Sequence, residues 1–189
     1  NFVFTGSDGR AYLGTAGHCT LAASNVSGDV GEFIYPVGSG PTVADKNGRI
    51  IGRITYAVQQ GVKDIALIRL GDGISFDKAM PHWGPLTGVN TSDAFTPIEL
   101  RWVGHGVGIG SVLYARSGMS LYTTNPDQVN GAGLIAPGDS GGPVVDAQGR
   151  AVGVNVAIGV GPLPQIITRL APQLARAASQ TGVTYTLAT

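Results

Sequence analysis

A single serine, Ser140, stands among glycines in the run PGDSGGP at residues 137–143. A serine hydroxyl becomes a strong nucleophile only when a base takes its proton and the charge that develops on the substrate is stabilised. Flanking glycines let the backbone approach a substrate carbonyl closely, and the N–H groups of Gly138 and Ser140 can then point at one oxyanion. The pattern GDSG alone also occurs in ordinary turns. The full run, directly before an apolar strand, predicts a catalytic nucleophile.

A histidine that can serve as the base, His18, lies in the run LGTAGHCT at residues 13–20. Imidazole suits this task because its unperturbed pKa is about 6.5. An isolated histidine after a strand is more often a turn or core residue, but the surrounding TAGHC favours a base. Asp64 opens the apolar run DIALI and can simply cap a turn. As a partner of His18, its carboxylate would fix the tautomer and stabilise the imidazolium. These residues predict a His18, Asp64 and Ser140 triad.

Short strands have to hold these residues, since turn signals recur along the chain and separate runs that are rich in Val, Ile and Tyr. The runs lie at residues 31–37, 50–58, 65–70, 98–103, 111–114, 143–146 and 151–156. Such a pattern is typical of an all-β barrel or sandwich. Residues 168–180 are the exception. Their apolar positions recur every three to four residues and predict a helix, with Thr168 as its cap and Gly182 as its stop.

The composition argues against several classes of function. The chain has 189 residues, and its Lys+Arg and Asp+Glu counts are both 12, which gives a formal net charge of zero. We therefore expect no binding to nucleic acid or to anionic membranes. No apolar stretch approaches the roughly 18 residues of a membrane-spanning helix. The histidines His18, His82 and His105 lack the spacing of metal ligands, so we expect neither a metal nor a cofactor.

In the chain order His, Asp, Ser, the segments TAGHC, DIALI and GDSGGP resemble those of the chymotrypsin-type serine proteases. The short bacterial branch of streptogrisin and α-lytic protease-like enzymes is most similar, over nearly the whole chain. The resemblance implies two six-stranded antiparallel β-barrels, at about residues 1–80 and 81–189, with a C-terminal helix and the active site between the barrels. It also implies a bacterial enzyme that is secreted or in the cell envelope, is exported behind a pro-segment, and acts as a monomer on polypeptides.

Two features depart from the family pattern. Cys19 matches a half-cystine whose partner would lie just upstream of Asn1, and it is the only cysteine in the chain. We expect it to be a small buried apolar group rather than a second nucleophile. Asp139 is normally neutralised, in the bacterial branch by a buried arginine. The alignment puts Arg101 in that place, so we expect an Arg101–Asp139 ion pair; the alternative is that Arg101 lies on the surface.

The resemblance also suggests which residues line the pocket for the residue before the cleaved bond. They are uncharged: Leu134, Ile135, Ala136, Val156, Ala157 and Ile158. Leu134 stands where trypsin-like enzymes carry an aspartate, so we expect neutral, apolar side chains to be preferred and Lys or Arg to be rejected. Val156 replaces a serine that supports the catalytic aspartate in the family. Ile158 replaces a glycine that leaves room for the peptide.

Three functions remain compatible with the sequence. The first is an active serine endopeptidase with the His18, Asp64 and Ser140 triad. The second is a catalytically latent or inactive protease-fold binding module, which only Val156 and Ile158 favour. The third is a quality-control protease of the HtrA-like group, since the strand GVNVAI at residues 153–158 is similar to one there. That group is usually trimeric, so the oligomeric state distinguishes it from the first.

Overall fold

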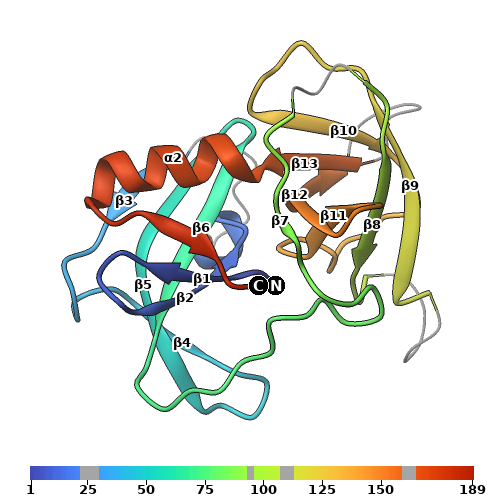
Figure 1. Cartoon of the computed structure of the whole chain (residues 1–189). Coiled ribbons are helices and arrows are strands. Elements are labelled where there is room, and N and C mark those ends of the chain that lie inside the picture. Colours follow the sequence, from blue (N-terminus) through green and yellow to red (C-terminus); the bar gives the residue numbers. More distant parts are fainter. Residues whose placement is uncertain (22–29, 93–95, 107–112, 159–164) are drawn as a thin grey trace.

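Two mainly antiparallel β-sheets form the two lobes of the molecule (Figure 1). The computed structural model describes residues 1–21, 30–92, 96–106, 113–158 and 165–189. The first sheet has seven strands, and its path runs in the order β14 (Tyr185–Leu187), β1 (Val3–Gly6), β2 (Ala11–Thr15), β6 (Lys63–Leu70), β5 (Ile50–Gln60), β3 (Gly31–Ile34), with β4 (Thr42–Ala44) also pairing with β5. The β-branched and apolar residues of β5 and β6 form long buried runs, as suits strands at the middle of a sheet.

The second sheet closes on itself. Its strands follow the order β11 (Pro143–Asp146), β8 (Glu99–Val103), β9 (Ala115–Leu121), β10 (Gln128–Ala132), β13 (Gln165–Arg169), β12 (Arg150–Ile158), β7 (Gly88–Val89). A further pairing between β11 and β12 makes a closed six-stranded barrel, with β7 attached in parallel outside the ring. Leu100, Trp102, Val144 and Ile167 are fully buried inside it.

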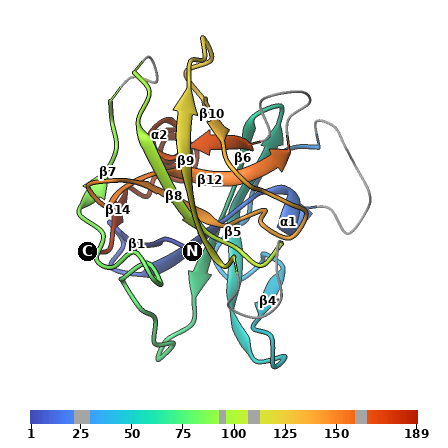
Figure 2. The same cartoon turned by 90° about the vertical axis from the view of Figure 1, so that its right-hand side faces the viewer.

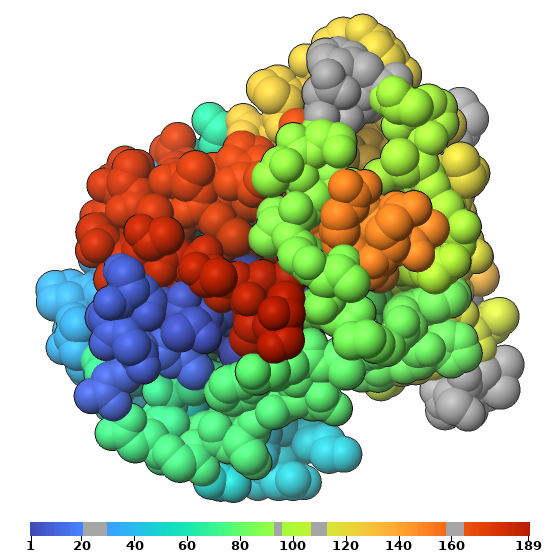
Figure 3. All heavy atoms as spheres, viewed as in Figure 1, coloured from blue at the N-terminus to red at the C-terminus, as the bar shows by residue number. Residues whose placement is uncertain are grey.

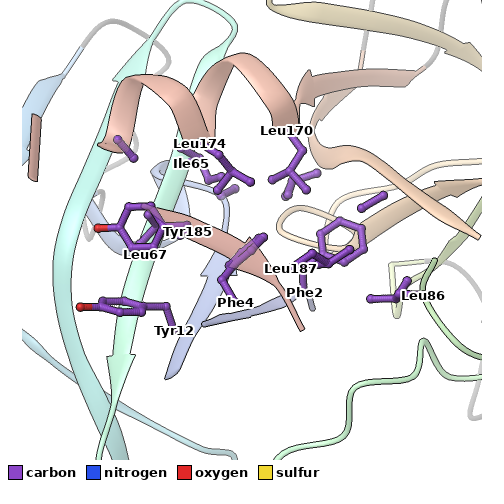
Figure 4. Close-up of a cluster of buried hydrophobic side chains, with 14 of the residues drawn as sticks. Phe2, Phe4, Tyr12, Ile65, Leu67, Leu86, Leu170, Leu174, Tyr185 and Leu187 are labelled. Carbon is purple, nitrogen blue, oxygen red and sulfur yellow. The ribbon is translucent and has the colours of Figure 1, made fainter. Parts of the chain in front are cut away.

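The helix α2 (Leu170–Thr181) follows β13 and lies over the first sheet (Figure 1). Its buried residues Leu170, Leu174 and Ala177 recur every three to four positions and belong to one core cluster with side chains of β1 and β6. Figure 4 shows Leu170 and Leu174 facing this cluster. Gly182 ends the helix in the left-handed conformation, with φ 71°, and its N–H donates to the carbonyl of Ala178. The predicted cap was wrong: Arg169 precedes the helix, and its side chain makes no capping bond.

The predicted fold class is confirmed: the chain is all-β, with a closed six-stranded barrel, a second sheet and one C-terminal helix. The first sheet differs in detail from a six-stranded barrel. It takes its edge strand β14 from the far end of the chain, where Phe4 pairs with Leu187. Figure 3 shows this C-terminal segment against the N-terminal hairpin, beside the green stretch that connects the lobes. A division at about residue 80 therefore does not describe the C-terminal segment.

Several predicted strands are present with shifted ends. β5 extends to Gln60, and β12 extends to Ile158. The predicted strand at 111–114 was wrong where it can be judged, because Leu113 and Tyr114 precede β9, which begins at Ala115; residues 111 and 112 lie outside the described part. A short helix, α1 (His18–Leu21), was not predicted. Figure 2 shows α1 beside β5, in the part of the molecule that carries the predicted base.

Candidate active site

His18 and Asp64 are joined by two hydrogen bonds. His18 begins α1 just after β2, and Asp64 is the second residue of β6, the strand that pairs with β2. The His18 backbone N–H donates to Asp64 Oδ1 at 2.8 Å, and Nδ1 lies 2.6 Å from Oδ2. Gly17 makes this approach possible, because a side-chain carbon there would overlap the Val58 carbonyl. The imidazole is thus held by Nδ1, which directs its Nε2 away from the carboxylate.

The other ring nitrogen of His18 contacts a thiol. Cys19 Sγ lies 3.6 Å from His18 Nε2. The hydrogen bond with Asp64 and, next, the contact with Cys19 raise the pKa of His18 to about 10, against the opposing effect of burial. Cys19 is exposed and free, so the expectation of a small buried group was wrong. The thiol therefore contacts the ring nitrogen that a catalytic base would use.

The loop that carries Ser140 is fastened to β12. Gly141 N–H donates to the Asn155 carbonyl at 2.8 Å, and Asn155 N–H donates to the Gly142 carbonyl at 2.9 Å. Gly138 and Gly141 have φ values of 99° and 82°, which favour glycine. Within the described residues, the N–H groups of Gly138 and Ser140 donate to no acceptor. The two predicted oxyanion donors are therefore available to a ligand.

The Ser140 loop lies against the segment that carries His18. A side-chain carbon on Gly141 would stand 3.5 Å from the Ala16 nitrogen and 3.8 Å from Cys19 Sγ. The side-chain amide of Asn1 also donates to the Gly141 carbonyl. In the part of the chain that the structure describes, no hydrogen bond joins the Ser140 hydroxyl to His18. Catalytic hydrogen bonds are often long before a substrate is bound.

A buried arginine does neutralise Asp139, but it is Arg116 and not Arg101. Arg116 donates from Nη1 to Asp139 Oδ2 at 2.7 Å and from Nη2 to Oδ1 at 2.6 Å. The backbone N–H groups of Gly106 and Ala136 also donate to this carboxylate, each at 2.9 Å. Burial alone would raise the pKa of Asp139, but these hydrogen bonds outweigh it and leave the pKa below its usual value.

The predicted Arg101–Asp139 pair was wrong because of strand alternation. Neighbouring residues of a strand point to opposite faces, and Trp102 points into the barrel. Arg101 therefore points outward, where it pairs with Glu99 at 2.7 Å and lies over the Trp83 ring. Arg116 is the cross-strand partner of Trp102 in the β8–β9 ladder, so it shares the inward face.

The predicted pocket residues lie at two places beside the Ser140 loop. Leu134, Ile135 and Ala136 connect β10 to this loop, and Leu134 is half exposed while its carbonyl accepts from Arg116. Val156 and Ala157 lie near the end of β12, where a bulge leaves Val156 without a partner in β13. The backbone of Ile158 ends β12, but its side chain lies outside the described part, so its effect on the groove stays a prediction.

A shallow hollow adjoins Ser140 on the side of the β8–β9 connection. Its lining includes Asn1, His105, Tyr114 and Gly138. The rings of His105 and Tyr114 are 4.8 Å apart.

Among the described residues, no group of three or more His, Cys, Asp or Glu side chains could hold a metal ion. No described helix is both long and apolar enough to cross a membrane.

Three residues of this region were not predicted: Arg116, Asn155 and Gln165. Each is polar and buried in a strand of the second barrel. The pattern offered one signal, since Asn155 is a polar residue within the apolar run at 151–158. Nothing comparable marked Arg116 or Gln165, because only the strand pairings show which way they face.

Comparison with known proteins agrees with this fold. Residues 2–154 match the family model described as a trypsin-like peptidase domain. The chain therefore belongs to the family of trypsin-like peptidases. No curated protein matches the chain.

Solved structures with the same fold include three proteases. One is a glutamic acid-specific serine protease described as using a novel histidine triad in substrate binding, at 21% identity and a TM-score of 0.60; the match covers 99% of this chain and 91% of that one. A chymotrypsin of Cellulomonas bogoriensis matches at 19% identity and 0.59, covering 97% and 87%. A protease from M. tuberculosis in its active form matches at 18% and 0.52, covering 96% and 73%. At these identities the likeness shows the fold alone.

Proposed function

We propose that the chain is a serine endopeptidase that works through an acyl-enzyme. His18 takes the proton of the Ser140 hydroxyl as Ser140 attacks the peptide carbonyl, and Asp64 stabilises the imidazolium that forms. The N–H groups of Gly138 and Ser140 receive the oxyanion. His18 then gives its proton to the leaving amine, and water hydrolyses the acyl-enzyme with His18 again as the base.

The observation that carries this proposal is the pair of hydrogen bonds between His18 and Asp64, with Nδ1 and Oδ2 2.6 Å apart, next to the Ser140 loop. A residue that only capped a turn would not need to hold both the backbone and the ring of a histidine. The Arg116–Asp139 pair supports the proposal further. It neutralises the residue before Ser140 and leaves the oxyanion donors uncommitted.

The proposed substrates are polypeptides with a neutral residue before the cleaved bond. The predicted walls at 134–136 and 156–158 carry no charge that could pair with Lys or Arg. The glutamic acid-specific relative is described as using three histidines to bind its substrate. Here His82 contacts Trp83 and His105 contacts Tyr114, and among the described residues no three of the His, Cys, Asp or Glu side chains form a group that could hold a metal ion. This favours a neutral preference over an acidic one.

A second candidate is a latent enzyme or a binding module with the protease fold. The Cys19 thiol 3.6 Å from His18 Nε2 favours it, because Nε2 is the atom that would have to accept the Ser140 proton. Val156 also lacks the hydroxyl that supports the catalytic aspartate in the family. The third candidate, a quality-control protease of the HtrA-like group, predicts a trimer, whereas we propose a monomer that is secreted or in the cell envelope of a bacterium, in the streptogrisin-like branch.

Labelling with a fluorophosphonate tests the proposal, with intact mass as the readout. We expect one adduct on the native chain and none on Ser140→Ala. Ser179→Ala is the matched control, because Ser179 is an exposed serine of α2 and should leave the labelling unchanged. A folded chain that takes no adduct would contradict the peptidase and favour the binding module.

A further inference from the structure

Two amide side chains are fully buried together in the second barrel. Asn155 and Gln165 each have 0% exposure. Gln165 Nε2 donates to Asn155 Oδ1 at 2.8 Å, and this single bond joins them. Among the described residues, neither Asn155 Nδ2 nor Gln165 Oε1 has a hydrogen-bond partner. The pair therefore keeps one complete donor group and one complete acceptor unused.

This result does not depend on how the two amides are oriented. If both were turned over, Asn155 would donate to Gln165, and the unused atoms would be an Asn155 oxygen and a Gln165 nitrogen. One NH₂ group and one carbonyl oxygen would still lack partners. Buried polar groups are nearly always paired, and an unpaired one is costly. A ligand that carries both a donor and an acceptor could form hydrogen bonds with both of these unpaired groups.

The pair lies directly behind the Ser140 loop. Asn155 holds Gly141 and Gly142 through its own backbone N–H and carbonyl. Its Nδ2 stands 3.6 Å from the place where a side-chain carbon on Gly142 would be. Gly142 is two residues from Ser140, so their Cα atoms are at most about 7.6 Å apart. The unused donor is thus close to the loop that carries Ser140.

The other strands around the pair are those that lead to the predicted pocket wall. Gln165 opens β13 opposite Gly131 of β10, and a side-chain carbon at Gly131 would overlap Gln165 Oε1. Only glycine leaves room for the amide at that point. Three residues beyond Gly131, the chain enters the wall at Leu134. The amides are therefore a built feature between the wall and β12.

We infer that Asn155 and Gln165 recognise a primary amide, and that the enzyme prefers glutamine or asparagine before the cleaved bond. This inference rests on the proposed peptidase function and narrows its neutral preference. A carboxamide offers an oxygen to Asn155 Nδ2 and an NH₂ group to Gln165 Oε1. An apolar preference was expected because the predicted wall residues are apolar. The two buried amides were not part of that prediction.

Other side chains satisfy the pair less well. A leucine leaves both atoms unpaired, a glutamate sets a carboxylate oxygen against Oε1, and a lysine has no acceptor for Nδ2. Because the pair is closed to solvent in the free protein, every substrate side chain has to open the space that it enters. Only an amide makes both hydrogen bonds, so only an amide gains their contribution to the binding free energy.

Five peptides that differ only in the residue before the cleaved bond test this inference. That residue is Gln, Asn, Leu, Glu or Arg. We expect kcat/KM for the glutamine peptide to exceed that for the leucine and glutamate peptides by about tenfold or more. The Gln165→Leu variant should lose this advantage over leucine. Gln173→Leu is the matched control, because Gln173 is a buried glutamine of α2 that also has an unpaired Oε1.

Fluorophosphonate labelling of the same samples separates this inference from the proposed function. Labelling of Gln165→Leu would show that the variant is folded and that its substrate profile can be read. If the native chain is labelled but cleaves the leucine peptide as fast as the glutamine peptide, the amide inference is wrong and the peptidase stands. If the native chain is neither labelled nor active, both the proposed peptidase function and the amide inference are wrong. A loss of the glutamine preference in Gln173→Leu as well would also overturn the assignment to Gln165.

Discussion

Gly104 lies so close to Asp139 that a side-chain carbon at position 104 would overlap the carboxylate oxygen Oδ1. The same carbon would crowd the guanidinium of Arg116 at 2.7 Å. The ion pair between Arg116 and Asp139 therefore requires glycine directly after β8, at position 104, more than ten residues before the arginine in the chain. This relationship makes position 104 a sensitive test of how the loop is held.

Replacement of Gly104 by alanine should disturb the oxyanion donors without touching a triad residue. The added methyl group displaces Asp139, and the N–H groups of Gly138 and Ser140 move with the loop. We expect the rate of fluorophosphonate labelling to fall by about 100-fold. Gly71→Ala is the control, since a side-chain carbon there meets its nearest neighbours at an ordinary 3.7 Å. Equal labelling rates for the two variants would contradict this role of Gly104.

The two arginines of the β8–β9 ladder should differ sharply in their contribution to stability. Arg116→Ala leaves the fully buried Asp139 carboxylate without its cation, which should lower the free energy of unfolding by about 3–5 kcal/mol. Arg101→Ala removes a partly exposed pair with Glu99 and should cost less than about 1 kcal/mol. Urea unfolding followed by tryptophan fluorescence measures both. A larger loss for Arg101→Ala would reverse the assignment made from strand alternation.

Asp64 should be essential to activity. Asp64→Asn keeps the size of the side chain but offers an NH₂ group to one of the two His18 atoms that now donate to the carboxylate. The imidazole then takes the wrong tautomer, and kcat should fall by about 10⁴-fold. A matched substitution is Asp127→Asn, which lies outside the triad and should retain activity. A small effect of Asp64→Asn on kcat would remove Asp64 from the proposed triad.

The peptidase activity should rise with pH across the neutral range. Only neutral imidazole can accept a proton, and the bond with Asp64 and the contact with Cys19 raise the pKa of His18 above 6.5. Cys19→Ala removes the second cause, so the acid limb of kcat/KM should move to lower pH. The pH profiles of the native chain and of Cys19→Ala measure this shift. Superimposable profiles would mean that the thiol does not act on His18.

The raised pKa of His18 also predicts a dependence of stability on pH. Protonated His18 binds Asp64 in the folded chain. The stabilisation that this pair gives the folded chain is therefore fully present below pH 6.5, the pKa of His18 in the unfolded chain. It is lost as the pH rises through the folded value near 10. Unfolding of Asp64→Asn should lack this alkaline loss, because the imidazolium there has no carboxylate partner.

The sequence could mark the candidate site residues because each lies in a local motif. The residues around Ser140, His18 and Asp64 carry their chemistry in short runs, and the alternation of apolar runs with turns was enough for the all-β class. The partner of Asp139 was missed because its choice depends on the register between β8 and β9. An alignment by spacing selected Arg101, whereas the ladder places Arg116 opposite Trp102 and inside the barrel.

The buried amides were missed for a related reason. Asn155 was read as part of an apolar strand, and Gln165 lay outside the predicted runs. Their meaning appears only when β12, β13 and β10 are side by side, because the hydrogen bond between them spans ten residues of chain. Local patterns report which elements form, but not which polar side chains meet within a barrel.

The pairing of β1 with β14 has a consequence for how the protein is made. Phe4 meets Leu187 across almost the entire chain, so the ribosome must release most of the polypeptide before the first sheet gains that edge. Contacts between such distant residues slow folding, because a long loop has to close before they form. The first lobe is therefore expected to mature late, after synthesis of the second, and a nascent chain would remain without a complete first sheet until then.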